Sequence, residues 1–280
     1  MREYGLQLSS IRNAITENYH DALRQVAEMG YKMAELYGGM GPGAQTLRSW
    51  MDEFGLRVSG THTKAADLAP DMLSQTIADH HTLGCDTLII PHYDISTDEK
   101  VDELVNLINT VQPVLEKEGI TLAFHNHSRE FWPNEAGQLT HFELQKRTDI
   151  KFELDTFWTF NAGYDPCEMM EKLADRLIAI HIKDGFKSKA VGAKAYGMPL
   201  GMGEAPVPAV YAKALAMKLP IIVESETQTP DGPTEARIGS VNLYAQKSKQ
   251  AAKEKSRYAM EESPRATSRC FMFMYFLLPH

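Results

Sequence analysis

Eight short apolar segments with strand-like composition alternate with helical segments, and this alternation limits the fold more than any other feature of the sequence. The strands are expected at residues 4–9, 33–37, 56–62, 86–92, 120–125, 151–155, 177–183 and 220–226. Helices are expected between them at 17–29, 43–54, 70–83, 98–118, 136–147, 166–175 and 207–217, with another from about 233. Strands joined by crossover helices form parallel sheets, and eight such units are the number that closes a (β/α)8 barrel.

An open, doubly wound sheet is the competing α/β architecture. The dinucleotide-binding version of that fold carries GxGxxG at its first strand-to-helix turn, where this chain has LSSIRNAITEN. We therefore predict one TIM-barrel domain over residues 1–246. Residues 247–280 are a C-terminal tail, polar and basic at first and then apolar over CFMFMYFLL (270–278). We expect this tail to lie outside the fold, with packing on the barrel or an interface as the alternatives.

Composition and charge exclude several classes of partner. The net charge is −8, and residues 247–280 hold seven Lys/Arg against three Glu, which leaves −12 on residues 1–246. Such a surface repels nucleic acid. The three cysteines are widely spaced, which predicts a reducing compartment. With no secretory signal and no apolar run of about 18 residues, we expect a cytoplasmic protein without a membrane partner.

Histidines and carboxylates end six consecutive expected strands, where a barrel carries its active site. They are His62, His92, His125 with His127, Glu153 with Asp155, His181 with Lys183, and Glu224 with Glu226. A single histidine at a strand end is more often structural, Asp155 could cap a turn, and Lys183 with Asp184 could be a solvated pair. Together, imidazole and carboxylate from neighbouring strands are typical of a divalent metal site, with Mn, Co, Mg, Fe or Zn as candidates.

Five motifs in strand order carry a resemblance to a known family. They are FHNHSREF, ELDTFWTFNAGYDP, RLIAIHIKDG, LGMGEAPVP and IIVESE. Over about residues 4–246 the chain resembles the sugar phosphate isomerase/epimerase superfamily, the xylose isomerase-like TIM barrels. This superfamily includes ketose epimerases, sugar isomerases, inosose and dehydroshikimate dehydratases, lyases of 3-keto-glycosides and an apurinic-site endonuclease branch. The resemblance therefore implies a TIM barrel that acts on a sugar, without fixing the substrate.

Similarity to the ketose 3-epimerases implies one divalent metal ion held from four strands. Asp155, His181 and Glu224 fall on three of the ligand positions. His125 falls on the fourth, where those enzymes have a glutamate that also serves as the second base. The predicted ligand set is therefore His125, Asp155, His181 and Glu224.

Other residues are expected to contact the substrate. Trp158 falls on a substrate-contacting histidine of the epimerases, and Lys187 falls on an arginine position. His62, His127 and Glu130 are further candidates because they lie at expected strand ends. Trp158 and Trp132 could also stack on an apolar sugar face, or simply pack.

The predicted chemistry is isomerisation or epimerisation of a sugar through an enediolate next to a keto group. A metal ion on two adjacent sugar oxygens would acidify the neighbouring C–H and stabilise the enediolate. Glu224 is the expected base, and His125 is either the fourth ligand or the opposing acid/base.

Because the second glutamate is replaced, a metal-dependent lyase or dehydratase acting on a 3-keto-glycoside or keto-cyclitol is the alternative. Lys183 or His125 would then be the acid. A barrel that binds sugar without catalysis is the remaining possibility. The expected partner is a small sugar or keto-sugar. Superfamily members often pair, so a homodimer is a further expectation.

Overall fold

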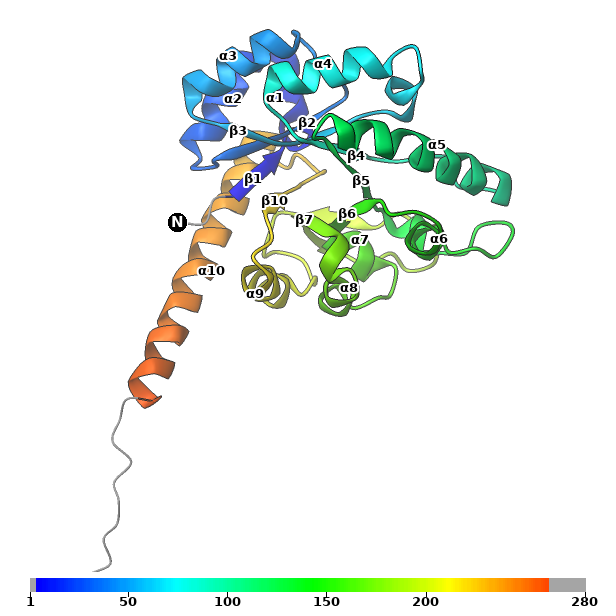
Figure 1. The fold of residues 1–280 in the computed structure, drawn as a ribbon. Helices are drawn as coiled ribbons and strands as arrows, with labels where there is room; N and C mark the ends of the chain where they lie inside the picture. The colour runs from blue at the N-terminus through cyan, green and yellow to red at the C-terminus, as the bar shows by residue number, and fades with distance from the viewer. Residues whose placement is uncertain (1–3, 262–280) are drawn as a thin grey trace, which may run out of the picture.

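Eight parallel strands close into a barrel in a computed structural model that describes residues 4–261, with side chains as far as Ala252 (Figure 1). Around the barrel the strand order is β1-β10-β7-β6-β5-β4-β3-β2. The strands are β1 (Tyr4–Gln7), β2 (Met33–Tyr37), β3 (Arg57–His62), β4 (Thr87–Ile90), β5 (Thr121–His125), β6 (Lys151–Asp155), β7 (Leu177–Ile182) and β10 (Ile221–Val223). The predicted (β/α)8 fold is confirmed.

Pairing between the first and last strands closes the barrel. Tyr4 of β1 is in register with Ile221 of β10, and Gly5 is in register with Met33 of β2. Strands covered on both faces consist mainly of apolar residues, which is why the sequence shows short apolar runs rather than alternation. Leu88, Ile89 and Ile90 of β4 illustrate this, because all three are buried.

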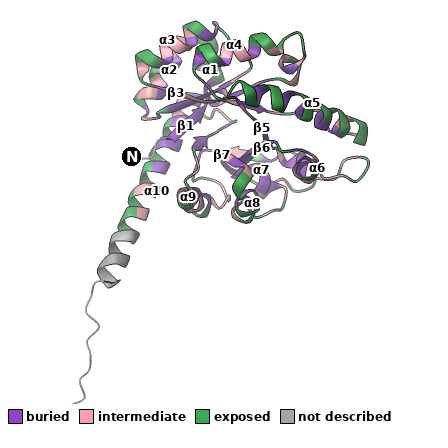
Figure 2. Cartoon of the chain, in the orientation of Figure 1, coloured by how far each residue is buried: buried purple, intermediate pink, exposed green. Residues whose placement is uncertain are grey.

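Helices surround the barrel, with buried residues facing the strands and exposed residues facing out (Figure 2). They are α1 (Arg12–Glu17), α2 (Tyr19–Glu28), α3 (Ala44–Phe54), α4 (Leu73–Leu83), α5 (Asp98–Lys117), α6 (Thr140–Arg147), α7 (Thr156–Asn161), α8 (Pro166–Lys172), α9 (Val207–Met217) and α10 (Gly232–Glu261). None of these described helices combines the length and apolarity needed to cross a membrane.

Two differences from the expected helices have local causes. The helix expected from residue 136 begins at Thr140, because the Asn134 side chain accepts hydrogen bonds from the amides of Ala136 and Gln138 and holds a turn there. Helix α7 was not expected. It starts directly after β6, where the side chain of Asp155 accepts a hydrogen bond from the amide of Trp158 and caps the helix.

A short antiparallel hairpin between β7 and α9 was also not expected. It pairs β8 (Asp184–Phe186) with β9 (Tyr196–Met198). Asp184 anchors the chain here, since its buried carboxylate accepts hydrogen bonds from four backbone amides of residues 185, 201, 203 and 205. The structure therefore excludes a solvated pair of Lys183 and Asp184.

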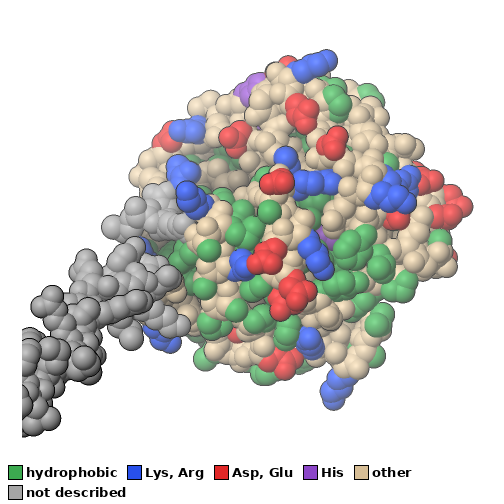
Figure 3. Space-filling model, turned by 60° about the horizontal axis from the view of Figure 1, so that its bottom comes forward, with side chains coloured by type: hydrophobic (Ala, Val, Ile, Leu, Met, Phe, Trp, Pro, Cys, Tyr) green, Lys and Arg blue, Asp and Glu red, His purple; other side chains and the backbone are tan. Residues whose placement is uncertain are grey.

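Helix α10 continues through the predicted domain boundary at residue 246 and projects from the barrel (Figure 1). Lys247, Gln250 and Ala251 line a pocket together with Tyr211 of α9. The boundary at 246 stays a prediction, and the apolar run 270–278 lies outside the described residues. On the face shown in Figure 3, acidic and basic side chains are interspersed.

Candidate active site

Ionisable side chains from five barrel strands, and from residues directly after β7 and β10, meet at the carboxyl ends of the strands. They are Glu35, His62, His125, Glu153, Asp155, His181, Lys183 and Glu224. All of them are buried except Glu224, whose side chain is 10% exposed. So many ionisable groups can be buried together only because they pair with one another. They form two layers, an upper one facing a pocket and a lower one inside the barrel.

The upper layer brings together the four predicted metal ligands. One ligand atom from each of His125, Asp155, His181 and Glu224 lies within 4.8 Å of the others. Nδ1 of His181 is 3.1 Å from Oε2 of Glu224. Two imidazoles and two carboxylates are a donor set that suits Mn, Fe, Co or Zn.

Asp155 provides a test of whether a cation fits this layer. Its Oδ1 accepts a hydrogen bond from the amide of Trp158, whereas its buried Oδ2 has no hydrogen-bond partner among the described residues. Burial raises the pKa of Asp155 to about 7, despite Lys183 nearby. A buried carboxylate oxygen without a donor is costly, and a bound cation would remove that cost. The residues therefore fit a divalent metal ion.

The lower layer contains two carboxylates that hold the imidazoles. Oε1 of Glu35 lies 2.6 Å from Nε2 of His181. Oε2 of Glu153 lies 3.0 Å from Nε2 of His62, 3.1 Å from Nδ1 of His125 and 3.1 Å from Nε2 of His181. Burial opposes protonation of His62, but Glu35 and Glu153 raise its pKa to about 9. These contacts direct Nε2 of His181 downward and leave Nδ1 for the upper layer.

Sequence reasoning missed Glu35 and assigned no role to Glu153. The one sign of Glu35 was a carboxylate within the apolar strand MAELY. His62, expected to contact substrate, pairs with Glu35 and Glu153 of the lower layer and also lines a pocket. His62, His125, Glu153 and His181 form a second group close enough to hold a metal ion.

Lys183 is a buried cation beside the upper layer. It forms an ion pair with Glu226, and its Nζ lies 3.6 Å from Oε2 of Glu224 and 4.0 Å from Oδ2 of Asp155. Burial opposes the charge, but these carboxylates raise the pKa of Lys183 above its usual value. Its Nζ also lies 4.7 Å from the ring centroid of Trp158. Lys183 is therefore protonated at neutral pH.

The loop after β5 separates its two predicted substrate contacts. The carboxylate of Glu130 accepts hydrogen bonds from the amide of His127, at 2.7 Å, and from Nε of Arg129, at 3.0 Å. Glu130 is fully buried and braces the loop. In contrast, His127 lines a pocket.

Two pockets open beside the upper layer. The first, which we call the reaction pocket, has a volume of about 270 Å³ and includes His62, His125, His127 and Glu224 in its wall. The second has a volume of about 420 Å³ and includes Trp132 and Trp158. Lys187, predicted to bind substrate, is exposed and lies elsewhere, with its Nζ 3.8 Å from the ring centroid of Phe160.

Fold and site together define a class of protein: a closed (β/α)8 barrel with a buried histidine and carboxylate cluster at the catalytic end. The family model described as "Xylose isomerase-like TIM barrel" matches residues 23–248. The chain belongs to this family, and the resemblance seen in the sequence is confirmed.

Similar proteins of known sequence or structure agree with this assignment. An inosose dehydratase from Geobacillus kaustophilus is 22% identical over 186 residues, which are 58% of this chain and 60% of that protein. The chain thus matches about 60% of the length of this curated relative.

Two solved structures resemble the fold. A sugar phosphate isomerase/epimerase from Parabacteroides distasonis has a TM-score of 0.72 and 24% identity, covering 87% of this chain and 98% of that one. The probable 3-DHS dehydratase of petrobactin synthesis from Bacillus anthracis has a TM-score of 0.68 and 14% identity, covering 87% and 99%.

Proposed function

We propose that the protein is a divalent-metal-dependent sugar isomerase or epimerase that acts at a C–H bond next to a carbonyl. The observation that supports this most is the meeting of His125, Asp155, His181 and Glu224 beside a pocket at the carboxyl ends of the strands, where Oδ2 of Asp155 accepts no hydrogen bond from a described residue. The names of the Parabacteroides distasonis relatives point to the same chemistry.

Glu224 is placed to accept the proton. A divalent ion held by the four ligands would polarise the sugar carbonyl and stabilise the enediolate. Glu224 lines the reaction pocket, and its Oε1 accepts a hydrogen bond from Oγ of Ser9 at 3.2 Å. Burial opposes ionisation, but Lys183 and His181 hold the pKa of Glu224 well below its usual range. Glu224 is therefore a carboxylate at neutral pH.

His125 fits the role of ligand better than that of acid. Burial lowers its pKa to about 4, even though Glu153 lies 3.1 Å from Nδ1. A neutral imidazole can donate a lone pair to a metal ion, whereas only the protonated imidazolium is an effective acid near neutral pH.

A lyase or dehydratase is the second candidate, favoured by the wall of the reaction pocket. Among the described residues that line it, Glu224 is the one carboxylate, so the pair of opposed carboxylates used in epimerisation is not formed. Elimination needs one base and one acid, which Glu224 and the protonated Lys183 would supply. The inosose dehydratase relative agrees with this alternative.

Metal analysis tests the proposal. Protein dialysed against a weak chelator should retain about one ion per chain, and Asp155→Ala should weaken binding about a hundredfold or more. Asp165→Ala is the matched control, because Asp165 also caps a helix, α8, but is exposed at the surface. Negligible metal in all three proteins would contradict the proposal.

Hydrogen exchange distinguishes the reactions. Metal-loaded protein is incubated with ketohexoses and 3-keto-glycosides in deuterated water. Deuterium in a recovered sugar supports an isomerase or epimerase, and an unsaturated product supports a lyase. If neither deuterium incorporation nor an unsaturated product appears across the panel, although metal is bound, the result would instead support a barrel that binds sugar without catalysis.

A further inference from the structure

The second pocket is larger than the reaction pocket and adjoins it. His92 and His127 line both, so these two side chains form a shared wall. The reaction pocket, at about 270 Å³, is smaller than the roughly 300 to 1,000 Å³ typical of sites for drug-sized ligands. It therefore suits one small ring, and a single sugar would leave the adjoining 420 Å³ without a role.

Two tryptophan side chains line the second pocket. They are Trp132 and Trp158, and both are partly exposed. The ring centroid of Trp158 is 5.9 Å from that of His127 in the shared wall. Partly exposed indole rings offer flat apolar faces at a small entropic cost, and such faces match the C–H side of a pyranose ring.

One polar atom near the shared wall lacks a partner. Nε1 of Trp158 is buried and has no hydrogen bond to any described residue. An indole N–H can only donate. Buried polar atoms are normally paired, and a ligand hydroxyl on this side of the wall would supply the missing acceptor.

Charge argues against a phosphate as the occupant. The guanidinium of Arg129 donates to Oε1 of Glu130 at 3.0 Å and to the carbonyl of Tyr93 at 2.9 Å. Its charge is thus compensated within the loop. Lys194, the other cation of this pocket, is exposed, where a lone ion pair contributes little.

We infer that the substrate is a glycoside of at least two rings, with the reacting sugar in the reaction pocket and the second ring on Trp132 and Trp158. This rests on the proposed function for the reaction pocket. The second pocket then supplies binding energy away from the reacting carbon, which can be used to orient the sugar at Glu224.

Calorimetric titration of the metal-loaded protein with cellobiose, maltose, D-fructose and D-glucose 6-phosphate tests the inference. We expect the best disaccharide to bind about tenfold more tightly than D-fructose, and Trp132→Ala to remove most of that difference. Trp132→Phe keeps a smaller ring, so its affinity difference should lie between those of wild type and Trp132→Ala. It replaces the alanine variant in the test if that variant does not fold.

Trp50→Phe is the matched control, because Trp50 of α3 packs against Tyr19 and His20 of α2, outside both pockets. It should leave every affinity at the wild-type value. Equal affinity for one and two rings, an equal loss for both in Trp132→Ala, or a preference for the phosphate would overturn the inference.

The two proposals fail separately. Deuterium exchange into a ketohexose without tighter disaccharide binding would overturn the glycoside inference and leave the proposed function intact. Disaccharide binding through Trp132 with no metal and no reaction would overturn the proposed function and leave a glycoside-binding barrel.

Discussion

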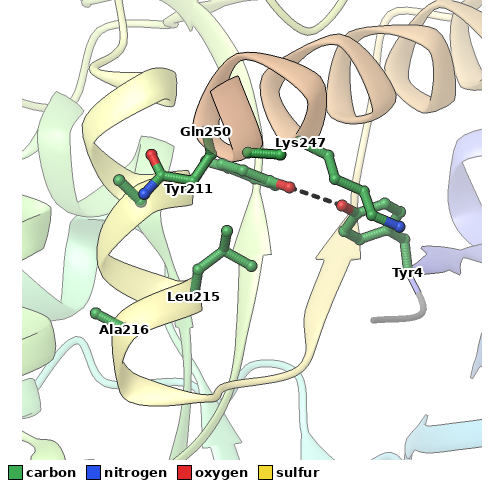
Figure 4. A pocket seen from close by; sticks show the side chains of 8 residues that line it. Tyr4, Tyr211, Leu215, Ala216, Lys247 and Gln250 are labelled. Atoms are coloured by element: carbon green, nitrogen blue, oxygen red, sulfur yellow. Dashed lines mark hydrogen bonds between the residues drawn. The ribbon is translucent and has the colours of Figure 1, made fainter. Parts of the chain in front are cut away.

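Both ends of the barrel carry pockets, and the largest pocket at each end has nearly the same volume, whereas the four candidate metal ligands meet at the carboxyl end. At the amino ends of the strands, a pocket of about 430 Å³ lies between α9, α10 and Tyr4 (Figure 4). Leu215, Ala216 and Lys247 line it, and the hydroxyls of Tyr4 and Tyr211 lie 2.7 Å apart. None of its described lining residues is a histidine or a carboxylate.

The carboxyl end differs in how its polar groups are satisfied. The tyrosine hydroxyls at the amino end bond to each other without charge. At the carboxyl end, Glu224 and Lys183 bring opposite charges out of water, and Oδ2 of Asp155 has no donor among the described residues. The two ends therefore differ in the electrostatic cost of their buried groups rather than in pocket volume. Such a cost is common where a protein gives up stability for activity.

Removing the buried cation should have the largest effect on this difference. Lys183→Met leaves Asp155, Glu224 and Glu226 facing one another without an ammonium group. We expect the metal-free protein to lose about 3–5 kcal/mol in the free energy of unfolding, measured with urea, because breaking a buried pair strands the remaining charge. Added Zn²⁺ or Mn²⁺ should restore part of the loss, since a cation would again face the carboxylates.

Lys213→Met is the matched control. Lys213 pairs with Glu171 at the surface, so its loss should cost less than about 1 kcal/mol. If both variants have the same free energy of unfolding, the buried charges at the carboxyl end carry no such cost. The proposed electrostatic difference between the two ends would then be wrong.

Glu35→Gln should show that the lower layer positions the upper one. Glu35 is buried and holds Nε2 of His181, which leaves Nδ1 to face Glu224. Loss of a carboxylate that orients a ligating histidine commonly weakens metal binding by about 10- to 100-fold. Glu53→Gln is the control, because Glu53 also contacts a histidine, His20, but at the exposed surface. Equal metal affinity of Glu35→Gln and wild type would assign Glu35 a role in packing alone.

Most of the fold was predictable, because short apolar strands and amphipathic helices with a 3.6-residue period alternate along the sequence. The failures are short elements governed by single side chains. Helix α7 spans six residues, too few for a periodic pattern, and depends on the Asp155 cap. The strand expected to end at residue 226 pairs only as far as Val223, which leaves Glu224 and Glu226 free to turn toward Lys183.

The candidate site was predictable where motifs fall at strand ends and unpredictable where contacts depend on closure of the barrel. The four predicted ligands do meet. Glu35 and His181 are 146 residues apart and come from strands that are not neighbours, so no local pattern links them. The loop after β5 shows the same limit, since spacing alone could not tell that Glu130 turns into the loop while His127 faces the pocket.

His141 differs from the histidines of the carboxyl end that have carboxylate partners. His141 of α6 is fully buried, with its ring centroid 4.3 Å from that of Phe131, and neither of its nitrogens has a hydrogen-bond partner among the described residues. Burial lowers its pKa to about 3. Since the folded pKa lies below the unfolded value of about 6.5, this neutral imidazole supports folding above pH 6.5 and costs stability as the pH falls toward 3.

His141→Phe should therefore flatten the loss of stability below pH 6.5. The slope of unfolding free energy against pH should differ from wild type by up to about 1.4 kcal/mol per pH unit, measured with urea between pH 7 and 5. Parallel slopes for the two proteins would show that His141 finds a proton acceptor when it becomes charged.

The smallest effect is expected at the amino end, where the tyrosine pair tests whether this pocket is structural. Tyr211→Phe should cost about 1 kcal/mol, the usual net value of one uncharged hydrogen bond. A double-mutant cycle with Tyr4→Phe should give a coupling energy of similar size. Metal affinity should stay at the wild-type value, because none of the described residues of this pocket contributes to the upper or lower layer. A fall in metal affinity with Tyr211→Phe would show instead that the two ends are coupled through β1, whose first residue carries the Tyr4 hydroxyl and whose last, Gln7, donates a hydrogen bond to Glu35.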